Sequence, residues 1–89
     1  MNLDAQAIEA AIKAQIVKIA DSLGSDASDL QADELIPATG LIDSAGLLDL
    51  IAWFEQAYAF KIPAEDLTID KLGSLQSMSA YLRQRKAAV

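Results

Sequence analysis

Apolar side chains recur every three or four residues along the first quarter of the chain, which is the spacing of one buried helical face. Asn2 or Asp4 can cap the start of such a helix, and Gly24 suits the left-handed turn that often follows a helix end. We therefore predict a helix over residues 4–23. Its predicted buried face consists of Ile8, Ala11, Ile12, Ile16, Ile19, Ala20 and Leu23.

A second helical repeat occupies residues 44–58. Asp43 and Ser44 stand at its start, and either side chain can accept a hydrogen bond from the free N–H groups of the first turn. The predicted inner face consists of Leu47, Leu48, Ile51, Phe54 and Tyr58. The positions predicted at the edges or outside are Asp49, Trp53, Glu55 and Gln56.

The segment between these helices, residues 25–42, is rich in Ser, Asp and Ala and contains Pro37 and Gly40. We interpret it as a long connection with at most one helical turn near residues 29–33. Structureless loops longer than ~12–15 residues are uncommon in compact domains. We therefore expect its apolar side chains to pin it across the bundle, namely Leu30, Leu35, Ile36, Leu41 and Ile42.

The last third of the chain predicts one short and one longer helix. Phe60 and Ile62 should point inwards, and Pro63 opens a short helix over residues 63–67. Residues 68–73 form a connection, after which Ser74 caps a helix over residues 74–85 in which Met78 is a core residue. No segment has the pattern of strands or of a repeat. The fold class is all-α, a small four-helix bundle in one domain over residues 1–89.

Composition removes several kinds of chemistry. The 89 residues include no Cys and no His, which excludes disulfides, thiolate nucleophiles, the usual zinc sites and the commonest general base. The acids of residues 21–34 lack the spacing of a calcium-binding loop. We therefore expect no metal site. With 53% hydrophobic and 22% charged residues the chain should fold, and we expect a monomer.

No apolar run is long enough to span a bilayer, and the first residues lack the basic start of a signal peptide. We therefore expect no membrane span and a cytoplasmic location.

The charge of the chain is unevenly distributed. The net charge is −6, and residues 19–60 contain no Lys or Arg, so Ser44 lies within an acidic stretch. Such a surface repels nucleic acid and anionic membranes and attracts basic protein surfaces, so we expect no nucleic-acid partner. The same charge is also explained by solubility alone.

Ser44 is the candidate for chemistry because it stands at the positive end of a helix dipole. A phosphate on its hydroxyl would meet unpaired N–H groups, a setting that favours it by about 0.3–1 kcal/mol. The position therefore suits a phosphodiester. The simpler interpretation is that Asp43 and Ser44 only cap the helix.

Three motifs together resemble the acyl carrier proteins and the related peptidyl and aminoacyl carrier proteins. They are Gly40-Leu41-Ile42-Asp43-Ser44, the helix through Phe54-Glu55, and Tyr58-Ala59-Phe60-Lys61-Ile62-Pro63. With the flanking helices, the resemblance covers nearly the whole chain. It implies a bundle of acyl-carrier-protein type, with a long loop between its first two helices and a short third helix.

The resemblance implies that Ser44 receives a 4′-phosphopantetheine arm from coenzyme A through a phosphopantetheinyl transferase. Asp43 would help to hold the magnesium ion of the transferase or dock its basic surface. The thiol of the arm, and no group of the protein, would carry the cargo as a thioester, so the chain is not itself an enzyme.

The helix over residues 44–58 corresponds to the helix that partner enzymes recognise in this family. The candidate recognition residues are Ala45, Leu47, Leu48, Asp49, Trp53, Glu55 and Gln56. Gly46 and Gln56 replace acids, and Ala45 replaces a leucine, of the members that serve fatty acid synthesis. These departures favour a stand-alone carrier in a specialised pathway. Its partners would include an adenylating enzyme that activates acyl or aminoacyl groups, an acyltransferase or synthase enzymes.

Two other classes of function remain open from the residues alone. One is an unmodified, acidic helical module that docks a partner through the helix over residues 44–58 and Trp53, a side chain that could equally cover the flank of the bundle. The other is an enzyme that uses carboxylates for acid–base catalysis. Asp43 and Asp49 make a poor pair for that chemistry because they do not share a helix face.

Overall fold

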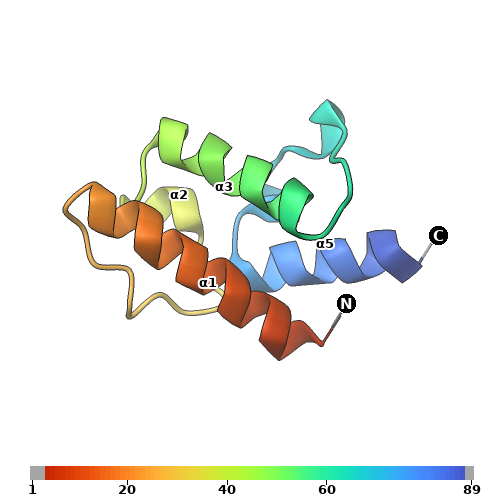
Figure 1. The fold of residues 1–89 in the computed structure, drawn as a ribbon, viewed down its shortest axis with the longest axis horizontal. Coiled ribbons are helices and arrows are strands. Elements are labelled where there is room, and N and C mark those ends of the chain that lie inside the picture. Colours follow the sequence, from red (N-terminus) through yellow and green to blue (C-terminus); the bar gives the residue numbers. More distant parts are fainter. Residues whose placement is uncertain (1–3, 88–89) are drawn as a thin grey trace.

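The first long helix, α1 (Ala5–Ser22), is one wall of the bundle in the computed structural model, which describes residues 4–87 (Figure 1). The Asp4 carboxylate caps it by accepting a hydrogen bond from the Ala7 N–H at 3.1 Å. Asn2, the alternative cap, lies outside the described residues. The helix ends at Ser22, and Gly24 follows with a left-handed φ of 79°.

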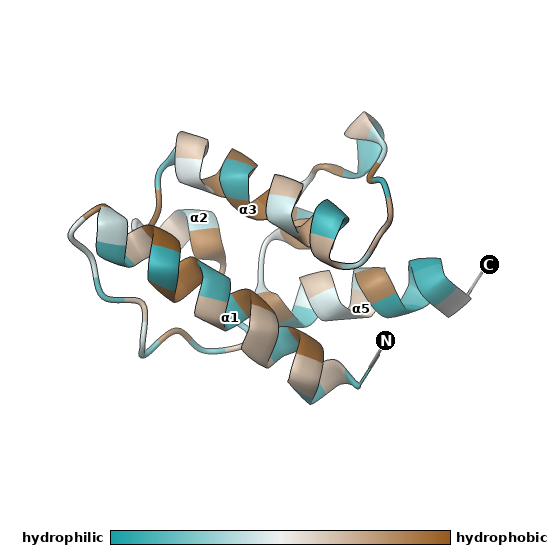
Figure 2. Ribbon diagram, in the orientation of Figure 1, coloured by the Kyte–Doolittle hydropathy of each residue, from teal (hydrophilic) through white to brown (hydrophobic). Residues whose placement is uncertain are grey.

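The prediction that Leu23 belongs to the buried face of α1 is wrong. Leu23 is 48% exposed, because it is the residue that ends the helix and no longer follows its periodicity. Figure 2 shows hydrophobic and hydrophilic positions alternating along the helix. The fully buried residues of its inner face are Ile8, Ile12, Ile16 and Ala20.

The connection over residues 25–42 contains a four-residue helix, α2 (Ile36–Thr39), where the sequence predicted no helix. It is short because Pro37 lies in its first turn and Gly40, at φ 70°, ends it. A contact with a distant segment fixes the position of this helix, since the Ile36 N–H donates a hydrogen bond to the Gly73 carbonyl at 2.7 Å. Leu30, Ile36 and Ile42 are buried as predicted, whereas Leu35 is exposed.

The second long helix, α3 (Ser44–Ala57), packs on α1 and lies above it in the view of Figure 1. Its inner face differs from the prediction. Leu48 is 68% exposed, whereas Leu50, which the sequence analysis left out, is fully buried with Phe54. Because four of the five residues from Leu47 to Ile51 are apolar, the helical phase is ambiguous in sequence, and packing against α1 selects the face that contains Leu50.

The chain after α3 forms a 3₁₀ helix, η1 (Ala64–Asp66), and then α4 (Ile69–Leu72), which lies in a segment predicted as a connection. Thr68 caps α4 by accepting a hydrogen bond from the Lys71 N–H. The last helix, α5 (Leu75–Ala87), is capped by Ser74, whose hydroxyl accepts a hydrogen bond from the Ser77 N–H at 3.1 Å.

The bundle is held by packing of α5 on α1 and α4, and of α3 on α1. Its core joins α1, α3 and α5, with Phe54 and Met78 fully buried as predicted. Ile62 is buried and Phe60 is half-buried, with its ring centroid 5.2 Å from that of Phe54. The predicted all-α bundle of acyl-carrier-protein type is therefore confirmed over residues 4–87. Among these residues, no helix is long and apolar enough to cross a membrane.

Candidate functional site

Ser44 is an exposed side chain at the first residue of α3, and the residue before it caps the helix. Oδ1 of Asp43 accepts a hydrogen bond from the Gly46 N–H at 2.7 Å, and the Asp43 carbonyl accepts one from the Leu47 N–H at 2.9 Å. The first bond satisfies one of the first-turn N–H groups that have no partner within the helix, and the second is the first backbone bond of the helix itself. Asp43 is therefore the cap, and Ser44 is not.

This division of roles leaves the Ser44 hydroxyl available for modification. Within residues 4–87 it makes no hydrogen bond, and the N–H groups of Ser44 and Ala45 find no acceptor there. They face the end of the helix where a negative group is favoured. An accessible hydroxyl beside two unpaired N–H donors fits a phosphodiester, so the residues around Ser44 are suited to the attachment of a phosphate-linked group.

A short turn holds the start of α3 in place. The Thr39 hydroxyl donates to the Ile36 carbonyl at 2.7 Å and accepts from the Leu41 N–H at 3.2 Å. Gly40 then reverses the direction of the chain. Ile42, the residue before Asp43, is anchored in the core by its buried side chain. Ser44 therefore projects from a fixed turn.

An apolar groove of about 220 Å³ begins next to the serine. A shallow hollow lined by Ser44, Asp43, Ile42, Pro37 and Leu47 shares the last two residues with this groove. The groove runs between α3, α2 and the segment around α4, and Thr68 is its only polar side chain. Its remaining lining residues are Leu48, Ile51, Leu67, Ile69, Leu72 and Gly73.

A family model described as a phosphopantetheine attachment site matches residues 16–82. The chain belongs to this family. The match confirms the resemblance to carrier proteins, and the cofactor of the family is a covalently attached 4′-phosphopantetheine. The chain therefore has a phosphopantetheine-carrier role, and carrier domains are not themselves catalytic. The family also implies interaction with transferases and biosynthetic enzymes. No curated protein matches the chain.

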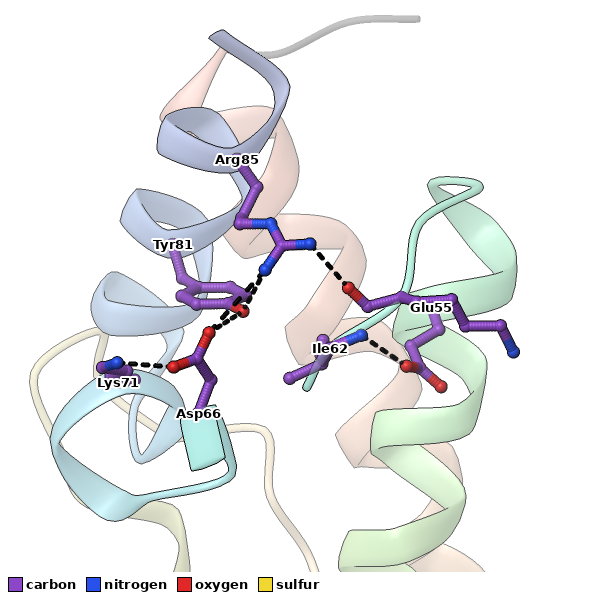
Figure 3. Close-up of polar contacts among 7 residues, drawn as sticks. Glu55, Ile62, Asp66, Lys71, Tyr81 and Arg85 are labelled. Atoms are coloured by element: carbon purple, nitrogen blue, oxygen red, sulfur yellow. Dashed lines mark hydrogen bonds and ion pairs between the residues drawn. The ribbon is translucent and has the colours of Figure 1, made fainter. Parts of the chain in front are cut away.

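We call the segment with Leu67 and Ile69 the outer wall of the groove. In this carrier the Asp66 carboxylate ties that wall to α5 (Figure 3). Asp66 lies at the end of η1, and its Oδ1 accepts a hydrogen bond from Lys71. Its Oδ2 accepts a hydrogen bond from the Tyr81 hydroxyl at 2.7 Å and lies 3.7 Å from Nη1 of Arg85. Arg85 also donates to the Lys61 carbonyl at 3.0 Å. We call Asp66, Lys71, Tyr81 and Arg85 the Asp66 network.

The network changes the titration of its members. The hydrogen bond from Lys71, followed by that from Tyr81, lowers the pKa of Asp66 below its ordinary value of 3.8. Burial raises the pKa of the Tyr81 hydroxyl, and its hydrogen bond to the Asp66 carboxylate adds to the effect. At neutral pH the carboxylate is therefore charged and the phenol is protonated.

The candidate recognition residues of α3 divide into exposed and half-buried positions. Glu55 is half-buried, and its Oε2 accepts a hydrogen bond from the Ile62 N–H at 2.7 Å (Figure 3). Trp53 is half-buried too, with its ring packed on Phe54 and Tyr58, which supports its interpretation as a cover for the bundle flank. Leu47 is the third half-buried position. The exposed ones are Ala45, Leu48, Asp49 and Gln56.

The outer wall of the groove was not predicted from the sequence. Leu67 and Ile69 are 46% and 54% exposed. Leu67 ends the short helix predicted over residues 63–67, and Ile69 lies in the connection predicted over residues 68–73. The apolar residues Leu67, Ile69 and Leu72 in this short stretch were the available signal. Among residues 4–87, no group of three or more Asp or Glu side chains could hold a metal ion.

Proposed function

We propose that Ser44 carries the 4′-phosphopantetheine arm of this carrier. The observation that supports it is the cap: because Asp43 occupies the first-turn donor, the neighbouring hydroxyl is exposed and free. Transfer would join Ser44 Oγ to the phosphorus of the arm and break the bond from that phosphorus to the bridging oxygen of the coenzyme A pyrophosphate. Adenosine 3′,5′-bisphosphate would leave with that oxygen, and the hydroxyl proton would be released. The terminal thiol of the arm supplies the thioester chemistry.

Asp43 contributes a second role in this proposal. Its Oδ1 holds the helix cap, while the side chain as a whole is exposed. We assign the remaining carboxylate oxygen to the transferase, through the magnesium ion of that enzyme or a basic residue. The acidic stretch around it would help to bring such an enzyme to the site.

The apolar groove supports an acyl cargo over a charged aminoacyl one. A cargo on an arm that starts at Ser44 would find a surface lined almost wholly by aliphatic side chains beside the attachment point. Burial of an alkyl chain there is favoured by about 0.8 kcal/mol per CH₂ group, whereas an ammonium group would lose its hydration. We therefore propose a carrier of acyl groups in a specialised pathway, served by an adenylating enzyme, an acyltransferase or a synthase.

Intact-mass analysis after incubation with coenzyme A and a promiscuous phosphopantetheinyl transferase tests the attachment. The wild-type chain should gain the mass of one arm, and Ser44→Ala should gain none. Ser22→Ala, which removes an exposed serine hydroxyl at the end of α1, is the matched control and should load like wild type.

Absence of a mass gain, or a gain that survives Ser44→Ala, would refute the proposal. The first result would leave the unmodified interaction module, with α3 as its docking helix. The packing of Trp53 on Phe54 and Tyr58 gives that alternative no added support.

A further inference from the structure

Gly46 is buried in the first turn of α3, where the helix packs against Ile19 of α1. A Cβ atom built on this glycine would lie 2.9 Å from Cγ2 of Ile19, 3.2 Å from Oδ1 of Asp43 and 3.3 Å from Cβ of Ile42. The first distance is shorter than real Cβ atoms tolerate, and the other two are tighter than most. Any other residue at this position therefore requires its neighbours to move.

The presence of glycine here has a local cost. Glycine in a helix is less favourable than alanine because its backbone loses more conformational freedom on folding. Gly46 has an ordinary helical conformation, so no left-handed turn explains the choice. The close approach to Ile19 does explain it, since only a residue without Cβ lets the first turn of α3 rest on α1 at this distance.

The same glycine takes part in the helix cap. Its N–H is the donor to Oδ1 of Asp43, and the oxygen that it meets is also one of the atoms that a Cβ would crowd. Displacement of residue 46 would therefore disturb the cap as well as the contact with α1. Ser44 lies between the two capping partners in sequence and would move with them.

We propose that Gly46 is a positioning residue for the modification of Ser44, an inference that rests on the proposed attachment at this serine. By seating the first turn of α3 on Ile19, the glycine fixes where the hydroxyl stands relative to the surface that a transferase grips. A side chain at position 46 displaces the turn outward and weakens the Asp43 cap. The hydroxyl is then misplaced for in-line attack, although the carrier still folds and binds.

Steady-state loading kinetics with coenzyme A, a promiscuous transferase and the full chain test this proposal. For Gly46→Ala we expect kcat to fall about tenfold, because small displacements of reacting groups have large effects on rate, while the KM for the carrier changes less than about twofold. A purely structural effect on docking would instead raise KM and leave kcat near the wild-type value.

A second substitution provides the rescue. Ile19→Ala removes the Cγ2 atom that a Cβ at position 46 would meet. In the double variant Ile19→Ala/Gly46→Ala, kcat should return to that of Ile19→Ala alone, a non-additive result that identifies the contact. Ala52→Gly, at an exposed position of α3, is the control for altered helix stability and should lower Tm without changing kcat.

The outcomes separate this proposal from the one on which it rests. If wild type does not load at Ser44, the attachment proposal fails. If wild type loads but Gly46→Ala has the wild-type kcat, or the double variant shows no recovery, the positioning role is wrong. Should Gly46→Ala fail to fold by circular dichroism, the double variant decides: recovery of folding and of loading supports the role, and absence of recovery overturns it.

Discussion

At the scale of single residues, adjacent or similar side chains have different roles. Asp43 caps α3, whereas Ser44 remains free for modification. The acids of α3 differ in the same way, because Asp49 is exposed while Glu55 is half-buried and bonded to the Ile62 N–H. Glu55, which the sequence predicted to face partner enzymes, therefore stabilises the turn that follows α3.

Substitution of Glu55 should affect the stability of the fold, whereas substitution of Asp49 should affect the loading reaction. Glu55→Ala removes a hydrogen bond from a charged acceptor and should lower the free energy of unfolding by about 1–2 kcal/mol. Asp49→Lys should leave stability within about 0.5 kcal/mol of wild type, since the residue is exposed, but should raise the KM for loading. Chemical denaturation and loading kinetics measure the two effects. Equal stabilities for Glu55→Ala and wild type would contradict the structural role.

At the scale of elements, the long helices were predictable and the short ones were not. Helices α1 and α3 repeat their apolar positions over several turns, which fixes their type from sequence. Helices α2 and α4 have four residues each, too few for a period, and a tertiary hydrogen bond from Ile36 to Gly73 links their segments. The candidate site at Ser44 could be proposed from the sequence because Asp43, Ser44 and the start of the helix are adjacent in the chain. The groove could not be, because it is assembled from separate elements.

The Asp66 network should make the stability of the α4 segment depend on acid. Since the pKa of Asp66 is lowered on folding, its contribution is fully present above the unfolded-state pKa of about 3.8 and is lost as the pH falls through the folded-state value. Asp66→Asn should therefore lower Tm by a few degrees between pH 5 and 7. The difference from wild type should shrink as the pH falls below 3.8 and through the lowered folded-state pKa of Asp66.

Thermal unfolding followed by circular dichroism across this pH range provides the measurement. Asp70→Asn is the matched control, because Asp70 is an exposed acid of α4 outside the network, and it should lower Tm less than Asp66→Asn does. A constant difference between Asp66→Asn and wild type at all pH values would show that the charge of the network does not stabilise the fold.

At the scale of the whole molecule, the bundle has a radius of gyration of 12.1 Å and places its apolar groove beside the candidate attachment residue. The proposed acyl cargo rests on this groove, because among the described residues no side chain next to Ser44 distinguishes an acyl from an aminoacyl group. A single domain over residues 1–89, a monomeric state and a cytoplasmic location remain predictions from the sequence.

An acyl cargo that enters the groove should stabilise the carrier. Loading the arm with acyl groups of increasing length should raise Tm until the groove is filled, because each buried CH₂ group contributes about 0.8 kcal/mol at most. A polar aminoacyl group of similar size should leave Tm unchanged. Thermal unfolding of the loaded carriers measures the series.

A variant that fills the groove provides the control. Ile69→Phe, at the exposed rim, should reduce the dependence of Tm on chain length, whereas Leu23→Phe, at an exposed leucine that does not line the groove, should preserve it. If Tm does not vary with chain length in the wild-type carrier, the cargo stays in solvent and the groove has another use.

The last turn of α5 affects where the chain can be cut when the carrier is excised or fused to another protein. The family match stops at residue 82, yet Arg85 and Lys86 donate to the carbonyl groups of Lys61 and Ala59, in the loop that leads to the groove wall. A fragment trimmed to the match would lose both tethers while retaining Ser44. The minimal unit for excision or fusion therefore extends to Lys86.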